Sequence, residues 1–203
     1  MTYAEIKRFT GVFAIATPFI IIITGLLNPS INNQNWWHSL SASYYNSFSA
    51  TAFISSFFIL SFLLSLNKEK LSKIASLLLI LIVIFPCMDG TIPISKSYVG
   101  LFKLSPSSSD KIHSIIALSL LIVMLITLVR TLILYKNKEL YSILLLLIIS
   151  MTTLIIIENI LHSKGNWSLH WTTIFSETIL FICFGICFYS SGLETKLKIS
   201  LSS

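Results

Sequence analysis

The chain has 203 residues, of which 55% are hydrophobic and only 11% are charged. A soluble domain carries about 25% charged residues, because its surface must stay hydrated, so the composition excludes an ordinary soluble domain and predicts a bilayer protein. The formal net charge of +6 does not indicate nucleic acid binding, because the basic residues lie in short segments between apolar runs and form no patch with interleaved aromatic residues.

Six apolar runs are long enough to cross about 30 Å of hydrocarbon at about 1.5 Å per residue. They cover roughly residues 9–27, 48–66, 72–88, 112–134, 141–162 and 171–192. The first run follows a basic pair, as in a signal peptide, but it is long enough to span and no small-residue cleavage site follows it. We therefore predict one domain over residues 1–203, an all-α integral membrane protein with a bundle of six transmembrane helices.

The basic residues alternate between the connections. Ten of the fourteen Lys and Arg lie before the first run, between the second and third, around the connection from the fourth to the fifth, and in the tail. The positive-inside rule then places both termini in the cytoplasm. Frequent Ile, Lys, Asn and Ser are typical of an AT-rich bacterial genome, so we expect a multi-pass protein of the bacterial inner membrane, with the lipid bilayer as its partner.

The ionisable residues of the outer side differ from those of the inner side. Each inner acid (Glu5, Glu69, Glu139 and Glu194) stands beside Lys or Arg, as expected for solvated loops. The outer side holds all four His and the other four acids: His38, His113, His162, His170, Asp89, Asp110, Glu158 and Glu177. A carboxylate within the hydrocarbon is costly, so Glu158 and Glu177 should face the bundle interior, a partner or water.

Three interpretations of this outer cluster stay open. It is a pocket that binds or senses a small or lipid-like ligand, or a set of polar residues that join helices in a membrane scaffold. The third is a metal-dependent intramembrane hydrolase acting on a lipid, with Zn²⁺ on His113, His170 and Asp89. No tight His pair of the H-x-x-x-H kind supports the third. The predicted ligand-binding residues are Ser43, Tyr44, Asp89, His113, Glu158, His170 and Glu177.

The aromatic segment NWWHSLSASYYNS, residues 35–47, precedes the second run. Trp36 and Trp37 are typical of residues that anchor a helix at the membrane interface. Ser43 and Tyr44 lie on the same predicted side as the His residues and are candidates for the wall of the pocket.

Four segments together resemble a pattern in small bacterial inner-membrane proteins: SLSASYYNSFSATAFISSFFILSFLL, IVIFPCMDG, DKIHSIIALSLL and FSETILFICFGICF. That family shows Ser-x-Ser-x-Tyr-Tyr before the second helix, Phe-Pro closing the third, His opening the fourth, and Glu followed by Phe-Gly in the last. More distantly, the chain is similar to the domain-of-unknown-function family 998 and to the DRAM/Frag/Sfk-type membrane proteins.

This resemblance covers nearly the whole chain and implies a six-helix bundle without a settled activity. Members often carry Arg-Asp after the Tyr pair where this chain has NSFSAT, so it lacks that charge partner for Glu177. The chain also resembles, more weakly, the alkaline ceramidase and adiponectin-receptor hydrolases, which use Ser, Asp and three His on Zn²⁺. The motif positions of the first family are Ser41, Ser43, Tyr44, Tyr45, Pro86, His113 and Glu177.

Overall fold

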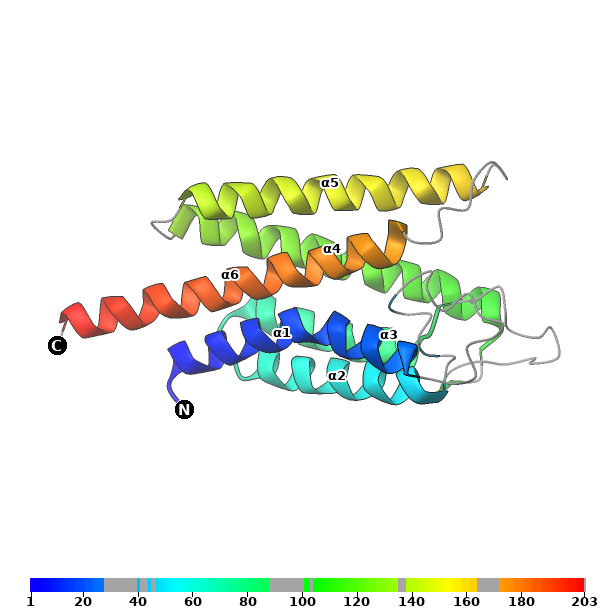
Figure 1. Ribbon diagram of the computed structural model, residues 1–203, viewed down its shortest axis with the longest axis horizontal. Coiled ribbons are helices and arrows are strands. Elements are labelled where there is room, and N and C mark those ends of the chain that lie inside the picture. The colour runs from blue at the N-terminus through cyan, green and yellow to red at the C-terminus, as the bar shows by residue number, and fades with distance from the viewer. Residues whose placement is uncertain are drawn as a thin grey trace.

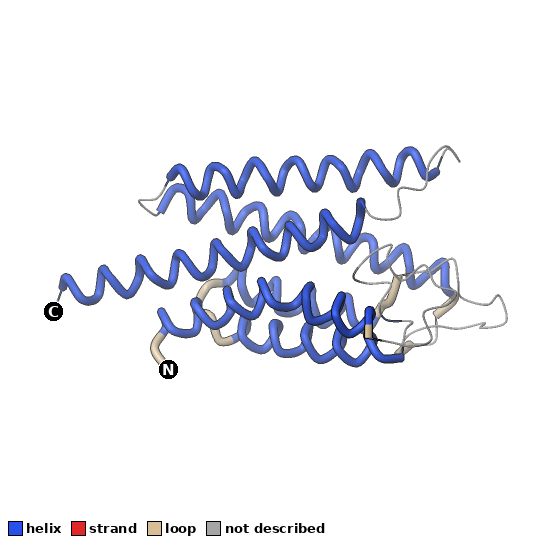
Figure 2. The backbone as a smooth tube through the Cα atoms, in the orientation of Figure 1, coloured by secondary structure: helices blue, strands red, loops and turns tan. Residues whose placement is uncertain are grey.

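A computed structural model describes residues 1–27, 40, 44, 47–87, 101–102, 104–134, 138–163 and 172–202. Within these ranges the chain forms six α-helices and no strand, as Figure 2 shows, so the prediction of an all-α protein is confirmed. The helices are α1 (Tyr3–Leu26), α2 (Ser47–Ser65), α3 (Lys70–Ile84), α4 (Pro106–Leu134), α5 (Lys138–Ser163) and α6 (Thr172–Ser202).

The helices lie along the long axis of the molecule, and successive helices run in opposite directions (Figure 1). Each packs against its neighbours in the chain, and α6 closes the ring by packing against α1. Both termini lie at the same end of the bundle as the short turn between α2 and α3 (Figure 1). We call this the termini end, and the other the opposite end.

Four helices of the described chain, α1, α4, α5 and α6, are long and apolar enough to cross a membrane. The described side chains of α2 form a shorter apolar helix over Ser49–Ser65, and α3 has 15 residues. Each apolar run of the sequence carries a helix, but the bounds differ. The third helix ends at Ile84 rather than near residue 88, because Pro86 follows it, and α4 begins earlier than expected, at Pro106.

The buried residues of α1 recur with the spacing found where two α-helices wind around each other in a left-handed supercoil. The buried positions include residues 4, 7, 11, 14, 18, 21 and 25, whose spacing alternates between three and four. Most of these residues are small, which allows a neighbouring backbone to approach closely. The most extensive contact of α1 is with α6.

Gly11 of α1 and Gly185 of α6 meet backbone to backbone in this contact. A Cβ atom on Gly11 would lie 2.5 Å from the Gly185 carbonyl oxygen, and one on Gly185 would lie 2.6 Å from the Gly11 carbonyl oxygen. Two turns further towards the C-terminus of α6, a Cβ on Gly192 would lie 2.9 Å from the Ala4 carbonyl oxygen. The two helices therefore cannot keep this separation with any larger residue at these positions.

We expect Gly185→Ala to lower the free energy of unfolding by about 1–3 kcal/mol, the usual cost of overpacking. Intrinsic helix propensity predicts the opposite sign, because Ala is a better helix former than Gly by about 1 kcal/mol. Thermal unfolding in mild detergent, followed by circular dichroism, measures the difference. Val12→Ile is the control, because it adds one carbon at a 53% exposed position of α1. A Gly185→Ala protein at least as stable as the wild type would contradict the close contact.

Candidate functional site

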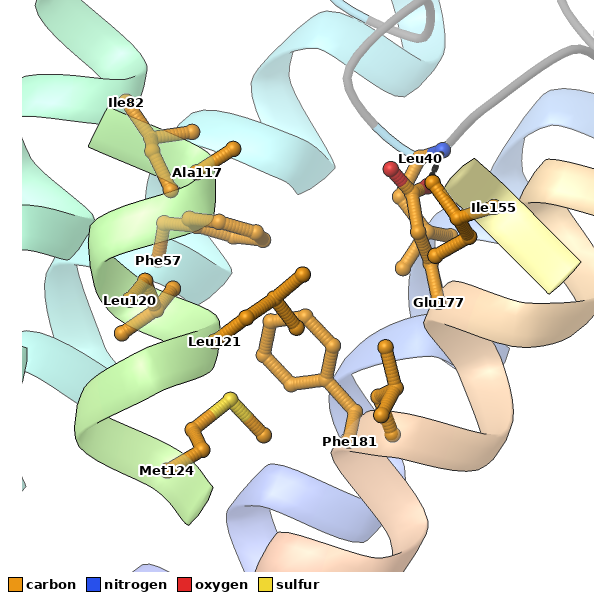
Figure 3. Close-up of a pocket in the computed structure, with 11 residues that line it drawn as sticks. Leu40, Phe57, Ile82, Ala117, Leu120, Leu121, Met124, Ile155, Glu177 and Phe181 are labelled. Atoms are coloured by element: carbon orange, nitrogen blue, oxygen red, sulfur yellow. Dashed lines mark hydrogen bonds between the residues drawn. The ribbon is translucent and has the colours of Figure 1, made fainter. Parts of the chain in front are cut away.

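A cavity of about 110 Å³ lies inside the bundle, between α2, α3, α4, α5 and α6. Most of its wall is aliphatic or aromatic (Figure 3). The lining residues are Leu40, Phe57, Ile82, Ala117, Leu120, Leu121, Met124, Ile155, Glu177, Leu180 and Phe181. Such a chamber suits an apolar group.

Among the described residues that line this cavity, Glu177 is the one ionisable side chain. Its Oε2 accepts a hydrogen bond of 2.6 Å from the backbone N–H of Leu40, and the two residues lie together, away from Met124 (Figure 3). The cavity therefore has one polar corner and an otherwise apolar wall. The Glu177 carboxylate can accept hydrogen bonds and attract a cation at this corner.

Ser176 precedes Glu177 in the chain, but it is not among the residues that line the cavity. Its side chain is fully buried, and its Oγ has no hydrogen-bond partner in the part of the chain that the structure describes. A buried hydroxyl without a partner costs free energy, and such groups in native proteins usually meet water or a ligand. The sequence analysis did not select Ser176, because serine is frequent throughout the chain.

The other predicted ligand-binding residues are not gathered around this cavity by the described part of the structure. Tyr44 is half-buried and packs against the apolar core, but it is not among the residues that line the cavity. Ser43, Asp89 and His170 lie outside the described residues, as does the side chain of Glu158, whose backbone belongs to the last turns of α5. Their roles stay predictions.

His113 is buried and holds the end of a neighbouring helix. Its Nδ1 lies 2.7 Å from the carbonyl oxygen of Phe85, the residue that follows α3. Because a carbonyl only accepts, Nδ1 donates. The Ser109 hydroxyl, one turn earlier on α4, donates to the Pro86 carbonyl oxygen at 2.7 Å. Pro86 prevents α3 from continuing, so two side chains of α4 satisfy carbonyl groups that the ended helix leaves open.

This contact separates His113 from the cavity and limits its use in a metal site. Ala117, one turn further along α4, lines the cavity, whereas His113 does not. Among the described residues, no three His, Cys, Asp or Glu side chains come together as a metal site would require. The zinc alternative needs Asp89 and His170, which lie outside those residues, and only Nε2 of His113 is left for a metal.

A second polar cluster lies at the termini end, where the sequence predicted only solvated residues. Lys7 of α1 is 3% exposed, and its Nζ lies 2.7 Å from Oε1 of Glu69 in the turn between α2 and α3. The Tyr3 hydroxyl donates to the same oxygen at 3.1 Å. Nearby, Asn67 is buried and donates to the Thr10 hydroxyl oxygen at 3.3 Å. The expectation that Glu69 is an ordinary solvated loop residue is therefore wrong.

The surroundings of Glu69 lower the pKa of its carboxyl group. Burial by itself raises the pKa of the Glu69 carboxyl, but the hydrogen bond and charge of Lys7, together with the Tyr3 hydroxyl, outweigh burial. The pKa of Glu69 therefore lies below its ordinary value of 4.5. The Lys7–Glu69 pair joins α1 to the α2–α3 turn as a charged contact.

Comparisons of the chain with protein-family models, with curated proteins and with solved structures find no match. The resemblance to bacterial inner-membrane families therefore stays a prediction from the motifs themselves.

We expect His113→Ala to lower the free energy of unfolding by about 1–3 kcal/mol, because it leaves the buried Phe85 carbonyl without its donor. His113→Gln should recover part of this loss, since the Gln amide can donate where Ala cannot. Thermal unfolding in detergent measures both variants, with Ser114→Ala on the exposed side of α4 as the control. If Ala and Gln at position 113 are both as stable as wild type, the carbonyl contact does not hold α3.

Glu69 makes stability depend on pH in a defined direction. A lowered folded-state pKa adds stability above the unfolded-state value of about 4.5, and this stability is lost as the pH falls through the lowered pKa. We expect wild type to be more stable than Glu69→Gln at pH 7, and the difference to shrink below about pH 4.5. Unfolding midpoints from pH 7 to pH 3 measure it, with Glu139→Gln at an exposed position as control. A difference that is constant with pH would show that the Lys7 pair does not lower this pKa.

Proposed function

We propose that the chain spans the bacterial inner membrane six times, with both termini in the cytoplasm. Four helices long and apolar enough to span support a membrane location, and the alternating directions of all six helices support the number of passes. Basic residues support the orientation. Ten of the fourteen Lys and Arg lie at the chain ends and in or around the connections from α2 to α3 and from α4 to α5, and the other four, Lys96, Lys103, Lys111 and Lys164, belong to the remaining connections and the start of α4. By the positive-inside rule the termini end faces the cytoplasm.

The proposed function is the binding or sensing of a small or lipid-like ligand in the Glu177 cavity. The observation that carries it is one carboxylate at the corner of an otherwise apolar chamber inside the bundle. An intramembrane ionisable residue is expensive and usually has a functional partner. The ligand therefore has an apolar body and a small head that donates hydrogen bonds, such as an ammonium or a hydroxyl group.

The volume limits the size of the group that enters. An engineered protein cavity of about 150 Å³ lined by Leu, Ile and Phe binds benzene. At about 110 Å³ the Glu177 cavity holds a smaller group, such as a head with a few carbons.

The hydrogen bond from Leu40 to Glu177 favours a scaffold as the second candidate function. In that case the carboxylate only holds the segment before α2, as His113 holds the end of α3. A scaffold binds nothing in the cavity, so direct binding measurements separate the two candidates.

The test uses the purified protein in lipid nanodiscs with three probes of equal length: 1-butylamine, 1-butanol and butyrate. We expect butylamine to bind best and butyrate least, because the Glu177 carboxylate attracts a cation and repels an anion. Saturation-transfer NMR detects binding, and the unfolding midpoint should rise with butylamine concentration by mass action. Glu177→Gln should weaken butylamine binding about tenfold or more, the size expected for losing a charged hydrogen bond.

Two matched variants on α4 test the location. Ala117→Leu fills the cavity and should abolish binding of all three probes, whereas Ser114→Leu adds the same side chain on the exposed side of the helix and should leave binding unchanged. Equal binding of the amine and the acid, or binding that survives Ala117→Leu, would favour the scaffold.

A further inference from the structure

A second hollow lies on the outer surface of the bundle, between α4 and α5, which lie side by side in Figure 1. Its volume is about 200 Å³, and its wall includes Leu118 and Ile122 of α4 and Ile149 and Thr152 of α5. Leu118 is 52% exposed and Ile149 is 47% exposed, so this hollow, the α4–α5 groove, faces the surroundings of the protein.

The groove lies next to the Glu177 cavity. Leu121 lines both of them, and Ile155, which lines the cavity, is one turn of α5 beyond Thr152 of the groove. Leu121 therefore forms part of the boundary between the cavity and the groove.

Both walls of the groove belong to helices long and apolar enough to cross a membrane. The medium that meets the groove in a bilayer is therefore hydrocarbon. Leu118 and Leu125, the first and last residues of α4 that line the groove, lie on either side of residue 120, the midpoint of α4. The groove thus lies at the depth where acyl chains of the leaflet at the opposite end terminate.

The polar groups that line the groove are compatible with an alkyl chain in it. The Thr153 hydroxyl donates to the Ile149 carbonyl oxygen of its own helix at 2.8 Å, so its hydrogen-bonding need is met within α5. No charged side chain lines the groove among the described residues. Thr152 supplies the other hydroxyl of the groove, and the rest of the wall is aliphatic.

We propose that the ligand is a single-chain amphiphile from the membrane itself, with a small donor head at Glu177 and an alkyl chain that leaves through the α4–α5 groove. This inference rests on the proposed function and specifies its ligand class. The head lies where the structure offers the Glu177 carboxylate, and the alkyl chain lies where the wall is mostly aliphatic and carries no charged side chain among the described residues. The ligand enters from the bilayer, so the site needs no opening to water.

The experiment uses a sixteen-carbon primary amine with a diazirine at the chain terminus, incorporated at low mole fraction into nanodiscs that hold the full chain. After irradiation, mass spectrometry maps the labelled residues. We expect labelling of Ile122 and Ile149 in clear excess over Ile126 and Ile143, which are exposed apolar residues of the same helices that do not line the groove. Unlabelled hexadecylamine should remove this excess, and palmitate should not.

Variants test whether labelling in the groove depends on binding in the cavity. Thr152→Trp fills the groove and should remove the excess labelling while butylamine still binds in the cavity. Ala117→Leu fills the cavity and should remove both the excess labelling and the binding of butylamine. Ser114→Leu on the exposed side of α4 should remove neither.

The outcomes separate this inference from the proposed function. Excess labelling that survives Ala117→Leu would identify ordinary boundary lipid and overturn the inference. Uniform labelling of all four exposed residues, together with normal butylamine binding, would also overturn it but leave the proposed function standing. Absence of butylamine binding in the wild type overturns the proposed function first.

Discussion

The backbone contact between α1 and α6 is the constraint on which the rest of the bundle depends. Gly11 and Gly185 let two helices from opposite ends of the chain approach until a single additional carbon would collide with a carbonyl oxygen. Since α6 packs against both α1 and α5, this contact closes the ring of helices. The wall of the Glu177 cavity includes residues from five helices, so its shape follows from how tightly α6 is held against α1.

Two groups of polar side chains give buried hydrogen-bonding groups their partners at the ends of helices. His113 and Ser109 donate to carbonyl groups left open where Pro86 follows α3. At the other end of the bundle Lys7 and Glu69 neutralise each other between α1 and the α2–α3 turn. Each contact joins a segment between two helices to a neighbouring helix. These polar residues therefore fix the positions of the connections, whereas the apolar residues fix the packing of the helices.

The sequence predicted the helices well because hydrophobicity over about 20 residues is a local property. The bounds were less accurate where one residue decides the end, as Pro86 does for α3. Glu69 was predicted to be a solvated loop residue from the Lys residues beside it in the chain, and its pairing with the buried Lys7 of α1 is a tertiary contact. The alternation of three and four that places positions 4, 7 and 11 on one face was present in the sequence and indicates the burial of Lys7.

The candidate site was harder to predict, because a cavity is a property of several helices at once. Glu177 was selected from its depth within an apolar run, and it does line the cavity. His113 was selected with it from the same side of the membrane, but its contact is the Phe85 carbonyl. The side of the membrane predicts only at which end of the bundle a residue lies. The residues of one site must also point into the same space and lie at the same depth along the bundle. Neither can be known before the helix rotations are fixed by packing.

The Leu40 contact bears on both interpretations of Glu177. A carboxylate that accepts a backbone N–H at 2.6 Å is oriented before any ligand arrives, so less side-chain entropy is lost when a second donor binds. If Glu177 served only to hold Leu40, larger apolar side chains could fill the space beside it. The unfilled space would then lower the stability of the protein without any gain in function. The coexistence of an oriented acceptor and an apolar space beside it is what favours a ligand over a scaffold.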